Sequence, residues 1–170
     1  MPIKNWFAAI LILLSTSACK DEYLSSIPDA PVNLTCDLTN YFVQLTTPGQ
    51  FSLVTKISGG YQISFPGKTP LAIRGEATNK EVYLGYGGLI IGNSSFSGYC
   101  AFDATCPVEA SRKAILAIKN DGLGTAVCPK CGSEFDLNNG GIPVKGESKE
   151  RLKQYKASLV SGATKLRVFN

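Results

Sequence analysis

The chain has 170 residues, 44% of them apolar, which is long enough to bury one core, and it contains no histidine. Its net charge of +4 is small and scattered, so the sequence predicts no nucleic-acid partner. Hydrolases and transferases built on histidine are excluded, and we expect a protein that is not an enzyme.

The first residues have the pattern of an export signal. Lys4 supplies a positive charge, and residues 6–14 (WFAAILILL) form an apolar run too short to span a bilayer. Small residues then precede Cys19, which resembles a bacterial lipobox, although Thr16 stands where leucine is usual. The resemblance implies that residues 1–18 are removed and that Cys19 carries a lipid anchor in the cell envelope, with membrane lipid as a partner. Secretion after an ordinary signal-peptidase cut is the alternative.

After a linker at residues 19–31, the sequence predicts one β domain over residues 32–170. Short runs in which apolar and polar residues alternate have the period of half-buried strands. The predicted strands cover residues 32–38, 41–45, 51–57, 61–65, 82–91, 99–103, 114–118 and 166–169. Residues 149–156 are the best candidate for a short helix. This pattern predicts an all-β fold, an antiparallel sandwich or small barrel.

Three cysteines stand in two turn-rich segments near the middle of this domain. Cys106 is followed directly by proline, and Cys128 and Cys131 stand three positions apart around a Pro-Lys pair. This layout predicts two facing loops that hold a metal ion or a cluster between them. Because the chain has no histidine, such a site must use sulfur or oxygen ligands.

The sequence around these cysteines resembles a known family. Residues 99–107 (YCAFDATCP), residues 126–137 (AVCPKCGSEFDL) and the following glycine pair are similar to the cluster-binding half of a Rieske domain. They are most similar to the Rieske-like lipoproteins of Bacteroides-type bacteria. The resemblance implies a β-sandwich with two cysteine-bearing loops, and it implies a 2Fe–2S cluster that carries electrons.

The resemblance assigns roles to individual residues, and two of them depart from the family pattern. Cys106 and Cys128 stand at the two cysteine ligand positions, and Ser133 stands at the position of a serine that tunes the cluster. Val108 and Cys131 stand where the family has its two histidine ligands. A cluster with histidine ligands is therefore impossible in this chain.

Several interpretations of the three cysteines remain open at this point. Cys106 could form a disulfide with Cys128 or Cys131, or the thiols could be idle. Zinc could be bound by the three thiolates, with Glu109 or water as a fourth ligand. A 2Fe–2S cluster with thiolate ligands is the third interpretation, but the signal lacks the arginine pair typical of proteins exported with an inserted cluster. We expect a structural or binding module, with no motif that identifies a protein partner.

Two further cysteines lie on the apolar faces of predicted strands. Cys36 alternates with leucines in residues 32–38, and Cys100 shares a strand face with Phe102. The envelope is an oxidising compartment, so the sequence predicts a buried structural disulfide between Cys36 and Cys100.

Overall fold

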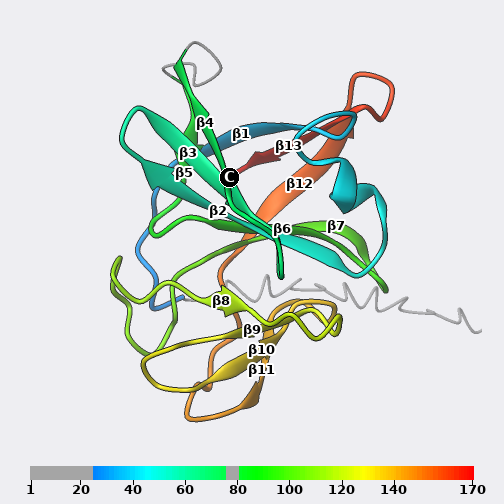
Figure 1. Cartoon of the computed structure of the whole chain (residues 1–170). Helices are drawn as coiled ribbons and strands as arrows, with labels where there is room; N and C mark the ends of the chain where they lie inside the picture. Colours follow the sequence, from blue (N-terminus) through cyan, green and yellow to red (C-terminus); the bar gives the residue numbers. More distant parts are fainter. Residues whose placement is uncertain (1–24, 76–80) are drawn as a thin grey trace, which may run out of the picture.

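The computed structural model describes residues 25–75 and 81–170 (Figure 1). The predicted signal at residues 1–18 and the lipidation candidate Cys19 lie outside the described residues, as does the first part of the predicted linker. In the described part, the strands are antiparallel and the only helix is a single 3-10 turn, so the predicted all-β fold is confirmed. No helix of this part is long and apolar enough to cross a bilayer.

Nine strands form one large sheet in the order β4-β3-β2-β6-β7-β12-β13-β1-β5. They are β1 (Val32–Asp37), β2 (Gln50–Ile57), β3 (Gly60–Ser64), β4 (Leu71–Arg74), β5 (Tyr83–Leu84), β6 (Leu89–Ser94), β7 (Gly98–Asp103), β12 (Gln154–Val160) and β13 (Lys165–Phe169). The sheet curls on itself, because β5 lies at one end of this order and still contacts β2. Figure 1 shows the curled sheet as the upper part of the molecule.

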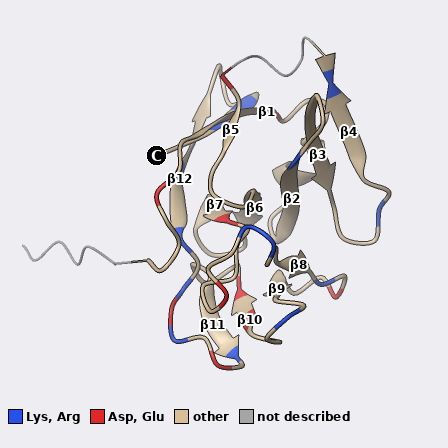
Figure 2. Ribbon diagram, turned by 90° about the vertical axis from the view of Figure 1, so that its left-hand side faces the viewer, with Lys and Arg blue, Asp and Glu red and all other residues tan. Residues whose placement is uncertain are grey.

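A second sheet of four short strands lies below the large one (Figure 1). Its order is β11-β10-β9-β8, with β8 (Ala117–Ile118), β9 (Thr125–Val127), β10 (Glu134–Asp136) and β11 (Ile142–Lys145). Charged residues of both signs are spread over both sheets, as Figure 2 shows. The cysteine-bearing turn between β9 and β10 belongs to this small sheet.

The core consists of two clusters separated by the large sheet. Alternation along β7 places Ala101 in the cluster inside the curl, whereas Cys100 and Phe102 point to the other side. This second cluster lies between the sheets and receives Phe135 of β10 and Cys128 of the cysteine turn. The small sheet is therefore attached to the large one through apolar packing beneath β6 and β7.

Two predicted strands are wrong or broken. Residues 41–45 form no strand, because η1 (Val43–Thr46) is a 3-10 helix whose repeat buries Phe42 and Leu45 together. The predicted strand at residues 82–91 is split into β5 and β6 by an intervening loop of glycines and Tyr86. There the Asp103 carboxylate accepts the backbone N–H groups of Tyr86 and Gly87, at 2.7 and 3.3 Å, and draws this segment out of the ladder.

The predicted helix at residues 149–156 is also wrong. Its apolar residues Leu152 and Tyr155 have helical spacing, but residues 149–153 form a loop without regular structure, and β12 begins at Gln154. Leu152 packs in the cluster between the sheets, and Tyr155 packs in the cluster inside the curl. Two cores on opposite sides of one sheet thus produce the spacing that suggested a helix.

Candidate metal centre

The first cysteine loop continues directly from β7. The Cys106 backbone N–H donates to the Ala114 carbonyl at 2.9 Å, and the Ala110 N–H donates to the Cys106 carbonyl at 2.9 Å. These bonds close the loop into a compact turn, and the Cys106 side chain is fully buried. Ser26 reaches across this loop, since its hydroxyl donates to the Pro107 carbonyl at 2.8 Å. The Cys106 sulfur is therefore held by a fixed backbone.

The second cysteine loop is the tight turn between β9 and β10. The Cys128 N–H donates to the Ser133 carbonyl and the Gly132 N–H donates to the Cys128 carbonyl, both at 2.9 Å. Gly132 adopts a φ of 72°, which glycine accepts without steric cost. Cys128 is buried and Cys131 is half-buried, so the turn directs both thiols inward and leaves one of them reachable from outside.

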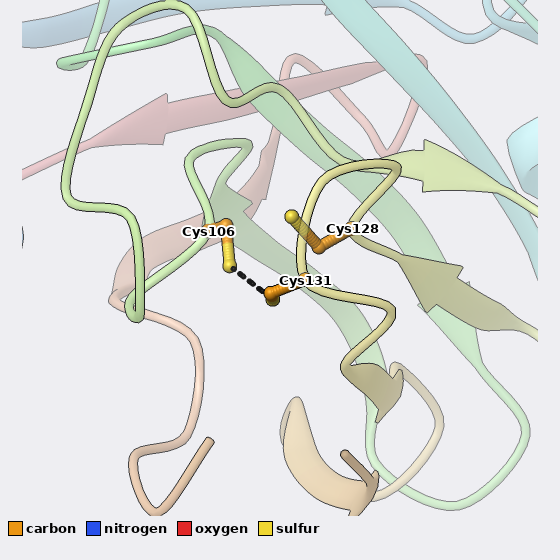
Figure 3. A group of neighbouring side chains, drawn as sticks. All are labelled: Cys106, Cys128 and Cys131. Carbon is orange, nitrogen blue, oxygen red and sulfur yellow. Dashed lines mark hydrogen bonds between the residues drawn. The ribbon is translucent and has the colours of Figure 1, made fainter. Parts of the chain in front are cut away.

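The two loops bring three sulfur atoms together (Figure 3). The ligand atoms of Cys106, Cys128 and Cys131 all lie within 4.8 Å of one another. Cys106 Sγ and Cys131 Sγ lie 3.6 Å apart, marked by the dashed line in Figure 3. A disulfide has an S–S distance of about 2.05 Å, and all three thiols are free. The alternative of a disulfide between the loops is thus not realised in this structure.

The sulfur atoms of Cys106 and Cys131 have surroundings that shift their pKa values in opposite directions. Burial raises the pKa of the Cys106 thiol, and the backbone N–H groups of Glu109 and Val108 offset only part of this rise. Burial also acts on Cys131, but the hydroxyl and N–H of Ser133, together with the two neighbouring thiols, bring its pKa below the ordinary value. Cys131 therefore becomes a thiolate more readily than Cys106, and the thiolate is the form that binds metal.

Ser133 lies next to a cysteine sulfur. Its Oγ lies 3.3 Å from Cys131 Sγ and accepts the Ser148 backbone N–H at 3.3 Å. That N–H occupies one lone pair of the hydroxyl, which leaves the hydroxyl hydrogen free to point toward a Cys131 thiolate. Ser133 is fully buried, so this contact is shielded from water.

A third loop supports the site, and the motif analysis did not identify its role. Gly146 packs so closely on Ser133 that a Cβ there would lie 2.5 Å from the Ser133 Cα. Its φ of 91° also favours glycine. The neighbouring Ser148 supplies the N–H that orients Ser133. The two cysteine motifs gave no signal for this support, because Gly146 and Ser148 lie outside both of them.

The predicted disulfide between Cys36 and Cys100 is absent. Both thiols are free, and the two residues belong to different core clusters on opposite sides of the large sheet. Burial raises the pKa of each thiol, for Cys100 to about 11, and keeps both protonated. Both are core residues, so the prediction that they lie on the buried faces of strands is correct, and the predicted bond between them is wrong.

The donor set fits a tetrahedral thiophilic ion better than a cluster. In a zinc site with Zn–S bonds of about 2.3 Å, sulfur atoms lie about 3.8 Å apart, close to the 3.6 Å between Cys106 and Cys131. Glu109 was a candidate fourth ligand, but its carboxylate lies 3.8 Å from Lys130 Nζ in a half-exposed ion pair at the rim. Cys100 is not in the group, since its thiol points to the Gly92 carbonyl.

No protein-family model matches this chain, and a search of curated proteins finds no relative. The geometry of the three thiols therefore carries the functional argument.

Proposed function

We propose that the protein is a lipid-anchored cell-envelope protein whose β domain binds one thiophilic metal ion, best matched by zinc, between its two cysteine loops. The observation that carries this proposal is the approach of three sulfur atoms to within 4.8 Å of one another, with none in a disulfide. The ion holds the two loops together. The domain serves as a structural or binding module and not as an enzyme.

The electrostatics of the three thiols support a cation at this place. Three buried or half-buried sulfur atoms in mutual contact cannot all ionise unless a positive charge compensates their repulsion. Backbone N–H groups already point at the sulfur atoms of Cys106 and Cys131, which is how metal-binding loops favour thiolates. When bound, zinc would supply the compensating charge, and Cys106, Cys128 and Cys131 would hold it.

The choice of zinc over a 2Fe–2S cluster rests on the number of ligands. A cluster of this type uses four protein ligands, two on each iron. The described residues offer three thiols at this place, and the chain has no histidine to replace the fourth. Zinc accepts three protein ligands and a water.

The Rieske-like assignment and the lipid anchor are part of the same proposal and have separate support. The assignment rests on the two cysteine motifs at residues 99–107 and 126–137, whose loops follow β7 of the large sheet and join β9 to β10 of the small sheet, and whose thiols face one another. The anchor rests on the signal-like residues 1–18 and the cysteine that follows them. In this proposal, lipid on Cys19 tethers the domain to the cell envelope.

Elemental analysis of the purified protein, combined with titration of its free thiols under denaturing conditions, tests the metal proposal. We expect one zinc ion per chain in a colourless protein. Cys106→Ser and Cys131→Ser should each remove most of the bound zinc. Cys100→Ser is the matched control, because it removes a buried thiol outside the cluster and should leave the zinc content unchanged.

Each other outcome identifies a different chemistry. Iron with labile sulfide and visible absorption would replace zinc by an iron–sulfur centre. A metal-free protein that lacks two titratable thiols would show a disulfide between the loops. A metal-free protein with all thiols titratable, or equal zinc loss in Cys100→Ser, would refute the site.

A further inference from the structure

A cavity of about 710 Å³ opens where the curled sheet nearly closes. It lies between the β2–β3 turn on one side and the segment from β5 to Gly88 on the other. This volume is within the range of about 300–1,000 Å³ that is typical of small-molecule sites. The residues that matter for its chemistry are Lys56, Val82, Tyr83, Leu84, Tyr86 and Arg112.

Among the described residues of the cavity wall, the charged ones are both positive. They are Lys56 and Arg112, and none of the described lining residues is an aspartate or a glutamate. The Arg112 guanidinium lies 4.4 Å from the centre of the Tyr86 ring, which fixes its position by a cation–π contact. Among the residues that the structure describes, neither cation forms an ion pair. The cavity therefore has positive charge available for a negatively charged ligand.

One carboxylate, that of Asp103, lies directly behind the backbone of Gly85, Tyr86 and Gly87, which forms the floor of the cavity, and this carboxylate is already satisfied. Asp103 accepts hydrogen bonds from the backbone N–H groups of Tyr86, Gly87 and Thr105 at 2.7, 3.3 and 2.9 Å. Its Oδ2 also accepts the Tyr155 hydroxyl at 2.8 Å. These four donors compensate its charge and anchor the floor backbone, so the floor is preorganised.

The floor also holds an unsatisfied polar group. Thr105 Oγ1 is the one buried side-chain oxygen or nitrogen in residues 25–75 and 81–170 that has no hydrogen-bond partner. It lies directly behind Gly87, where a Cβ would overlap it, and beside Ile115; both of these residues line the cavity. Buried polar groups without partners are rare in folded proteins, and a functional role is one of the explanations for them. Thr105 Oγ1 thus lies in the same region as Lys56 and Arg112, the two cations without an ion pair among the described residues.

The rest of the wall suits an apolar body. Tyr83 and Tyr86 present aromatic rings, and Val82 and Leu84 add aliphatic surface beside them. Tyr83 is 47% exposed although it is a large side chain on a strand. Aromatic side chains of this kind can stack on a planar ligand.

We propose that this cavity binds a small organic anion with an aromatic or apolar body, whose negative group is held by Arg112 and Lys56. The residues that line this cavity do not include the three cysteines of the candidate metal centre. The cavity is connected to the metal centre through the chain, because Arg112 belongs to the loop that begins at Cys106. The proposal does not depend on which metal, if any, the cysteines bind.

The test uses two probes of equal shape on the purified protein, 2-naphthoate and its uncharged analogue 2-naphthamide. Affinity is measured by calorimetry, and the site is mapped by backbone amide chemical shifts in NMR. We expect saturable naphthoate binding that shifts amides in residues 82–88, with naphthamide weaker. Arg112→Met should weaken naphthoate about tenfold, since it removes a charged hydrogen-bond donor.

Lys113→Met is the matched control. It removes the same charge from the next position of the same loop, outside the cavity wall, and should change naphthoate affinity less than about twofold. Melting temperatures of all variants show whether they remain folded. Absence of saturable binding, equal affinity for both probes, shifts elsewhere on the protein, or equal weakening by Lys113→Met and Arg112→Met would each overturn the proposal.

Discussion

The large sheet and the small sheet differ in how they are stabilised. The large sheet includes strands of up to eight residues and buries apolar side chains on both faces, inside its curl and beneath β6 and β7. The small sheet has strands of two to four residues, and its middle strands bury one side chain each, Ala126 and Phe135. Small sheets of this kind need packing partners to be stable. The comparison shows that the small sheet depends on its apolar packing beneath β6 and β7, and the proposed metal ion would add a second attachment.

The apolar attachment can be broken at a single residue. Phe135 is fully buried between the sheets, so Phe135→Ala should lower the free energy of unfolding by about 3–5 kcal/mol, measured by urea denaturation. Phe96→Ala is the control of equal chemistry, because Phe96 is 82% exposed and its loss should cost less than about 0.5 kcal/mol. Equal effects of the two substitutions would contradict the proposed packing.

Removal of the metal should destabilise the small sheet more than the large sheet. A chelator should destabilise the protein by about 2.7 kcal/mol if free zinc had been present at about one hundred times its dissociation constant. In hydrogen exchange, the lost protection should be concentrated in residues 117–145, while β2, β6 and β7 keep theirs. Cys106→Ser should show no response to the chelator. Uniform loss over both sheets would contradict a local role of the ion.

The smallest expected effect concerns a charge cluster across the small sheet. Glu134 lies 2.7 Å from Lys119 Nζ and 3.1 Å from Lys145 Nζ, and hydrogen bonds from Lys119 and Lys145 hold the pKa of its carboxyl below the usual range. Such a carboxyl stabilises the fold above its unfolded pKa of about 4.3, and this contribution is lost as pH falls through the folded pKa. Glu134→Gln should therefore lower the melting temperature at neutral pH, and the difference from the wild type should shrink in acid.

The exposed Glu147 provides the control for this pH dependence. Glu147→Gln removes the same charge from the neighbouring third loop and should change the melting temperature little at any pH. A difference between Glu134→Gln and the wild type that stays constant with pH would show that the residue acts through packing and not through its charge.

The difference in strand length between the two sheets explains which strands the sequence could predict. Strands β1, β2, β3, β7 and β13 were found at nearly their observed bounds, because each is long enough to show alternation. Strands β9, β10 and β11 were missed as elements, since three or four residues cannot display a period. The two cysteine motifs nevertheless indicated facing loops, because proline and glycine at a fixed spacing from cysteine specify a turn locally.

Features that depend on the whole topology could not be predicted from short sequence patterns. Cys36 and Cys100 both have buried strand positions, but a sequence does not show which face of a curled sheet each one occupies. Similarly, the support of Ser133 by Gly146 and Ser148 joins residues that are more than ten positions apart. The cavity beside Arg112 arises from the curl of the large sheet, which brings β5 to β2.

X-ray absorption at the zinc edge of the purified protein tests the central claim most directly. If Cys106, Cys128 and Cys131 bind zinc, the spectrum should show three sulfur neighbours at about 2.3 Å from zinc and one lighter atom. Zinc surrounded by oxygen and nitrogen alone, or protein without zinc whose peptides join Cys106 to Cys131 through a sulfur–sulfur bond, would contradict it.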